Sequence, residues 1–122
     1  MNYEELKAYL LAKPFATLDF PFGDDVSVFK VKNKMFALIG NRNGLMMLNL
    51  KCDPDEAAAL CDIYSAITPG YHMDKKHWIS LYFDGSVADS ETMRLIDNSF
   101  NLVVSKLSKK EQLSIKLLNH VT

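Results

Sequence analysis

Apolar residues in the first twelve positions and in the last third of the chain recur every three or four residues. This spacing is typical of helices that bury one face. It predicts a helix over residues 3–12, before which Asn2 and Glu5 resemble a capping pair, and a helix over residues 90–107. A further helix is expected from Ser108, where a capping box opens it. Another helix is predicted after Asp53, because Asp53 can cap it, a proline follows in the first turn, and Glu56 can complete a capping box.

Between these helices apolar and polar residues alternate, as in strands with one buried face. The expected strands cover residues 15–19, 26–32, 35–39, 45–50 and 77–83. Tight turns are expected at Asn33–Lys34 and at Asn43–Gly44, while residues 68–76 are expected to be irregular. The pattern predicts an α+β fold, in which a hairpin meander forms part of a single antiparallel sheet.

Length and composition place the chain among ordinary globular domains. It has 122 residues, of which 48% are hydrophobic and 24% charged, so we expect one domain over residues 1–122. The longest apolar stretches are far too short to cross a bilayer, and the amino terminus is acidic and polar. We therefore expect a cytoplasmic protein with no membrane partner.

No motif in the sequence predicts catalysis or a cofactor. GxSxG, Walker and GxGxxG patterns are all absent, so we expect no catalytic residue and no enzyme activity. His72 and His77 flank Asp74, and Cys52 or Cys61 could in principle add a ligand for a metal ion. Because nothing in that spacing fixes a coordination geometry, we expect no bound metal.

Charge is distributed unevenly, although the formal net charge is only −1. Residues 26–52 contain five basic residues and no acidic one, and residues 71–78 form a second cluster of bases around aromatic side chains. Such clusters can neutralise phosphates, and aromatic rings can stack on bases. The candidate nucleic-acid-binding residues are Lys30, Lys32, Lys34, Arg42, Lys51, His72, Lys75, Lys76, His77 and Trp78. The alternative is that the lysines keep the outer sheet face solvated and that Trp78 belongs to the core.

Several short segments, in order, carry a resemblance to a known family. They are Pro21-Phe22-Gly23, Lys34-Met35-Phe36-Ala37, Leu50-Lys51-Cys52-Asp53-Pro54, Pro69-Gly70-Tyr71-His72-Met73-Asp74-Lys75 and Asp84-Gly85-Ser86. The chain resembles the MmcQ/YjbR family from about residue 14 to residue 110. The resemblance implies a CyaY-like (frataxin-like) domain with helices on one face of an antiparallel sheet, and DNA binding through a double-wing arrangement of hairpins. Asn33 and Phe100 depart from the glycine and tyrosine of many members.

Together these observations favour a small binding domain over an enzyme. The hypothesis is weak binding of duplex DNA that depends strongly on salt and little on base sequence. One alternative is a protein-interaction module that uses the loop before Trp78, with no partner identified. The other is frataxin-like iron binding by acidic residues of the first helix and first strand. Those acids are Glu4, Glu5, Asp19, Asp24 and Asp25.

Overall fold

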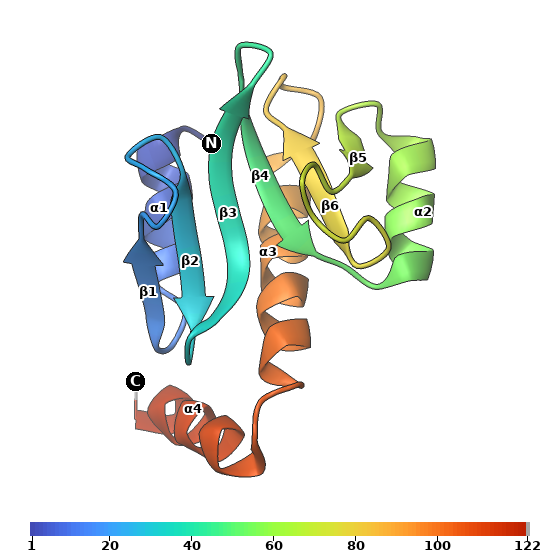
Figure 1. The fold of residues 1–122 in the computed structure, drawn as a ribbon. Helices are drawn as coiled ribbons and strands as arrows, with labels where there is room; N and C mark the ends of the chain where they lie inside the picture. Colours follow the sequence, from blue (N-terminus) through green and yellow to red (C-terminus); the bar gives the residue numbers. More distant parts are fainter. Residues whose placement is uncertain (122) are drawn as a thin grey trace.

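The computed structural model describes residues 1–121, with side chains as far as residue 118, and shows an α+β fold (Figure 1). Its helices are α1 (Tyr3–Leu11), α2 (Pro54–Ile63), α3 (Asp89–Val104) and α4 (Lys109–Val121). Its strands are β1 (Ala16–Asp19), β2 (Ser27–Val31), β3 (Lys34–Arg42), β4 (Leu45–Lys51), β5 (Ile67–Pro69) and β6 (Trp78–Tyr82). The predicted fold class is confirmed. Strand β5 is an addition, since no strand was expected there.

One antiparallel sheet contains the six strands found within residues 1–121, in the order β1-β2-β3-β4-β6-β5. The predicted meander is β2-β3-β4. Strand β6 returns beside β4, with Tyr82 opposite Met47, and β5 pairs with the outer side of β6. Strand β5 ends at Pro69, which cannot donate a backbone hydrogen bond and therefore suits an edge strand.

Two-residue turns join the strands of the meander. Lys32 and Asn33 have φ of 49° and 66°, while Asn43 and Gly44 have φ of 54° and 78°. Positive φ at both central positions matches the right-handed twist of the paired strands. The Asn43–Gly44 turn was predicted correctly. The first turn lies one residue earlier than expected, because Val31 pairs with Lys34 and Lys34 therefore opens β3.

The helix starts confirm two predicted caps and show one error. At α1 the Asn2 side chain accepts from the Glu5 N–H and the Glu5 side chain accepts from the Asn2 N–H, which completes a capping box. Asp53 caps α2, as predicted. Glu56, however, does not return to the cap; it pairs with Arg94 of α3 at 3.3 Å. This carboxylate therefore joins two helices rather than closing one.

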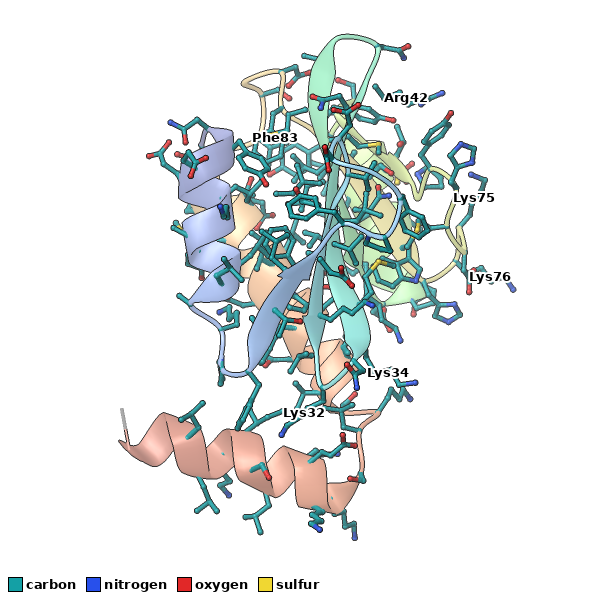
Figure 2. All side chains as sticks on the ribbon, turned by 60° about the vertical axis from the view of Figure 1, so that its left-hand side comes forward. Lys32, Lys34, Arg42, Lys75, Lys76 and Phe83 are labelled. Carbon is teal, nitrogen blue, oxygen red and sulfur yellow. The ribbon has the colours of Figure 1, made fainter. Side chains whose placement is uncertain are left out.

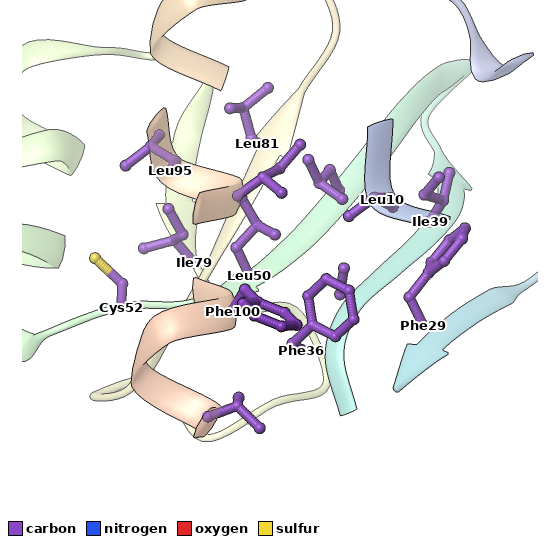
Figure 3. Packing of buried hydrophobic residues seen from close by; sticks show 14 of the residues in the cluster. Leu10, Phe29, Phe36, Ile39, Leu50, Cys52, Ile79, Leu81, Leu95 and Phe100 are labelled. Atoms are coloured by element: carbon purple, nitrogen blue, oxygen red, sulfur yellow. The ribbon is translucent and has the colours of Figure 1, made fainter. Parts of the chain in front are cut away.

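The main core lies between the sheet and helices α1 and α3, on what we call the helix face of the sheet (Figures 1 and 3). Phe36 of β3 and Phe100 of α3 pack edge to face, with ring centroids 5.2 Å apart. The Ser99 hydroxyl donates to the Phe36 carbonyl at 2.6 Å and accepts from the Lys51 N–H at 2.9 Å. One buried hydroxyl thus fastens α3 to both central strands.

Helix α4 lies beyond one end of the sheet, apart from the other helices (Figures 1 and 2). The predicted capping box is present, since Ser108 and Glu111 exchange backbone-to-side-chain hydrogen bonds. Ile115 is buried, whereas Leu113 and Leu117 are more than half exposed. None of the helices within residues 1–121 is long and apolar enough to span a membrane.

Candidate functional site on the loop face

The opposite side of the sheet, which we call the loop face, is covered by irregular chain. Segments 20–26 and 70–77 lie over it, and α3 lies behind the sheet (Figure 1). Val28, Met47 and Tyr82 occupy strand positions that alternate with the helix-face residues, yet they are only 2%, 5% and 9% exposed. A second, smaller apolar layer therefore exists where the sequence suggested a solvated face.

A buried polar cluster fastens segment 70–77 to the sheet. The Ser80 hydroxyl donates to the Asn49 side-chain oxygen at 2.5 Å and accepts from the Tyr71 N–H at 2.9 Å. The Asn49 side-chain NH₂ group donates to the Tyr71 carbonyl at 3.4 Å. Both strand side chains are almost fully buried. Since an unpaired buried polar group is costly, these bonds determine where the segment lies.

Internal hydrogen bonds shape the rest of that segment. The Lys75 ammonium donates to the Gly70 carbonyl at 3.1 Å. The Asp74 carboxylate lies 2.9 Å from His77 Nδ1 and accepts from the Lys76 N–H at 3.0 Å. The pKa of Asp74 is lowered, first by the hydrogen bond with His77 and then by that from Lys76. The segment is consequently an ordered turn that presents its lysines outward.

Arg42 lies near the end of this face that holds the β3–β4 turn. Its guanidinium donates to the Tyr82 hydroxyl at 2.8 Å and stacks 3.9 Å above the Tyr71 ring. The Tyr71 ring also contacts the His72 ring, and the two ring centroids are 4.0 Å apart. The hydrogen bond to Tyr82 raises the pKa of Arg42 above its ordinary value, so this side chain is a permanent cation.

Between the two covering segments the loop face is hollowed into a groove of about 480 Å³. Its floor comes from β3 and β4, and its sides come from segments 20–26 and 70–77. The lining is mainly apolar. It includes Phe22, Met35, Leu38, Met47, Tyr71 and Met73, with Gly40 in the floor.

The structure brings four of the candidate lysines to this side of the sheet and a fifth to its end. Lys30 and Lys51 belong to the cross-strand pairs Lys30–Met35 and Lys51–Trp78. Figure 2 shows Lys75 and Lys76 on the same side, and Lys34, which opens β3 opposite Val31, at the end of the sheet. We call the five the basic strip: Lys30, Lys34, Lys51, Lys75 and Lys76. His77 and the half-buried Trp78 adjoin it.

Two other candidate residues lie apart from the basic strip. The Lys32 ammonium sits 3.8 Å from the centroid of the Phe15 ring and points away from the loop face (Figure 2). Arg42 is at the far end of β3, a strand of nine residues. At about 3.3 Å per residue the two hairpin turns are therefore about 30 Å apart. The two turns therefore lie at opposite ends of the strand.

Most of the strip is available to an anionic partner. Lys30 lies 3.6 Å from a carboxylate oxygen of Asp19. Lys34, Lys51 and Lys76 form no ion pair with any side chain of residues 1–118. An incoming phosphate therefore does not have to displace an internal partner at those three positions.

The two cysteines and the acidic side chains considered for metal binding have the following surroundings in the described residues. Burial raises the pKa of the Cys52 thiol to about 12, and burial also raises the pKa of Cys61. A protonated thiol is a poor nucleophile at neutral pH. Among the described residues no three His, Cys, Asp or Glu side chains are grouped so as to hold a metal ion. Of the acids considered for iron, Asp19 faces Lys30 and Glu5 caps α1.

The sequence pattern did not reveal the groove. Its lining residues come from segments up to 51 positions apart, from Phe22 to Met73, and two of those segments are irregular. One signal was present: β3 and β4 carry apolar residues at consecutive positions, such as Met46–Met47 and Leu38–Ile39. Such runs indicate a strand buried on both faces.

Comparison with known proteins gives a consistent result. A model of the YjbR family matches residues 11–102. The chain is 40% identical to the uncharacterised Escherichia coli O157:H7 protein YbdF over 93% of each chain. It is 31% identical to the Escherichia coli K12 protein YjbR over 96% of this chain and 100% of that one. The crystal structure of Deinococcus radiodurans protein DR2400 is similar, with a TM-score of 0.85 and 32% identity over 93% of this chain and 86% of that chain. A Pseudomonas syringae crystal structure matches with a TM-score of 0.73 and 28% identity over 84% and 98%.

Proposed function

The chain belongs to the YjbR family, and from the geometry of its loop face we propose that it is a non-catalytic domain that binds duplex DNA weakly. The observation that supports this proposal is the basic strip, in which four lysines from β2, β4 and segment 70–77 lie on one side of the sheet and Lys34 lies at its end. The strip refines the sequence-based hypothesis, because Lys32 and Arg42 are no longer among the expected contacts.

The physical basis of binding is the release of counterions from the phosphate backbone. Each phosphate that a lysine neutralises adds about 0.9 to the slope of log K against log salt. Because the chain as a whole carries a net charge of −1, attraction is confined to the strip. No pair of side chains on it is arranged to read base edges. We expect low affinity, strong salt dependence and little preference for sequence.

A fluorescence-anisotropy titration with a labelled duplex, at low and at physiological salt, tests the proposal. The variant Lys34→Glu/Lys51→Glu reverses two unpaired charges of the strip and should lower the salt slope by about 2, because two phosphate contacts are lost. The matched control is Lys7→Glu/Lys116→Glu, which makes the same change in net charge on α1 and α4. The control should retain most of the affinity.

The result that overturns the proposal is equally definite. Absence of binding at low salt, or equal losses in the two double variants, would mean that the lysines only solvate the sheet face. The protein-interaction hypothesis would then replace DNA binding.

A further inference from the structure

The groove on the loop face has features that DNA binding through the basic strip does not require. It is apolar, it is walled by two ordered segments, and it ends near the Arg42 cation. We propose that it binds a small organic anion with an apolar body, such as a medium-chain or aromatic carboxylate. This inference does not depend on the DNA proposal, because it uses different residues of the same face.

The size and lining of the groove fit such a ligand. A volume of about 480 Å³ falls in the range of sites that enclose small organic molecules. Met35, Met47 and Met73 line it from β3, β4 and segment 70–77. Methionine is flexible and polarizable, so three methionines allow the walls to adjust to an aliphatic or aromatic body. Phe22, which is 71% exposed, stands beside the groove and can cover a bound molecule.

Gly40 provides the most specific support. Glycine in the middle of a strand weakens it, so its presence there usually reflects a backbone or packing requirement. Gly40 has neither: its φ is not in the left-handed region, and an added Cβ would make only ordinary contacts, at 3.7 Å to Met47 and 3.8 Å to Leu38. What a side chain at Gly40 would change is the space in the groove floor. The glycine therefore keeps the groove open.

Arg42 supplies the complement to a carboxylate. Its position on β3 is two residues beyond Gly40, on the same side of the strand, and it stacks on Tyr71 of the groove wall. Of the five N–H donors of the guanidinium, one is used by the Tyr82 hydroxyl. Arg42 makes no ion pair with any side chain of residues 1–118. Tyr71 and Tyr82 hold the guanidinium in place, which lowers the entropy lost when it binds a carboxylate.

The chain contains its own controls for a binding experiment. Of its six methionines, Met35, Met47 and Met73 line the groove, and Met1, Met46 and Met93 do not. Met46 is the neighbour of Met47 but packs on the helix face. Titration with 1-anilinonaphthalene-8-sulfonate, an apolar aromatic anion, should shift the ¹³C-methyl NMR signals of the first three and leave the others unchanged. Uniform shifts, or none, would overturn the proposal.

Variants then separate the apolar and the anionic parts of the site. Gly40→Leu fills the floor of the groove and should weaken binding of the fluorophore 1-anilinonaphthalene-8-sulfonate at least tenfold. In a competition experiment, decanoate should displace the fluorophore from the Arg42→Gln variant only at about tenfold higher concentration than from the native chain. The neutral decanol should displace it from both proteins at the same concentration. If Arg42→Gln weakened the binding of decanoate and decanol equally, Arg42 would not recognise the carboxylate, and the proposal of an anion site would be wrong.

Two control variants locate the binding on the surface. Leu113→Ser/Leu117→Ser removes the exposed apolar side chains of α4 and should have no effect; a loss of binding there would overturn the proposal. Lys34→Glu/Lys51→Glu should retain fluorophore binding even where it abolishes DNA binding, so the two proposals can fail separately.

Discussion

The two faces of this sheet bury apolar residues by different means. On the helix face, α1 and α3 cover the strands with regularly spaced apolar side chains, and Phe29, Phe36 and Leu50 have no exposed surface. On the loop face, irregular segments held by hydrogen bonds cover a thinner layer, and a groove remains between them. Helices satisfy their own backbone groups, whereas irregular chain must find polar partners. The comparison indicates that one face provides most of the stability, while the other retains an open groove.

The largest effect should come from the helix face. Phe36→Ala removes a fully buried ring and its edge-to-face contact with Phe100, and should lower the free energy of unfolding by about 3–5 kcal/mol. Leu38→Ala, two positions along β3 on the loop face, should cost less than half as much because Leu38 is only partly buried. Denaturant unfolding of both variants measures the difference. Equal losses would contradict the division between the faces.

A smaller effect is expected from the polar cluster of the loop face. Asn49→Ala leaves the Ser80 hydroxyl without its acceptor and the Tyr71 carbonyl without its donor, which should cost about 1–3 kcal/mol. Hydrogen exchange should show that the loss is greatest at the Tyr71 N–H and its neighbours. Asn41→Ala, an exposed asparagine on β3, is the control and should change stability little. A loss spread evenly over both faces would mean that the cluster does not act locally.

The smallest effect should have the opposite sign. Gly40→Ala should stabilise the fold by about 0.5–1 kcal/mol, since alanine costs less backbone entropy and meets no close neighbour. Gly70→Ala should instead destabilise, because its Cβ would lie 2.8 Å from the Trp78 Cβ. Thermal unfolding of the two variants distinguishes them. Destabilisation by Gly40→Ala would show that this glycine has a structural role and would weaken the argument for an open groove.

The sequence alone determined the elements that depend on neighbouring residues. Alternation of apolar and polar residues placed the strands of the meander, and Asn43–Gly44 placed a turn. The Asn2 and Ser108 capping boxes placed two helix starts. Each of these signals arises from interactions within about four residues, so the linear pattern contains the information.

Tertiary structure decided what depends on residues far apart. The position of β5 beside β6 and the tie between Asn49, Ser80 and Tyr71 join residues 9 to 31 positions apart. The candidate lysines were identified by composition, but strand register and the path of segment 70–77 selected five of them as one surface and set Lys32 apart. The groove is the extreme case, since it exists only when the segments that wall it have been folded over β3 and β4. No local pattern encodes an empty space, because the space is defined by side chains that meet only in the folded protein.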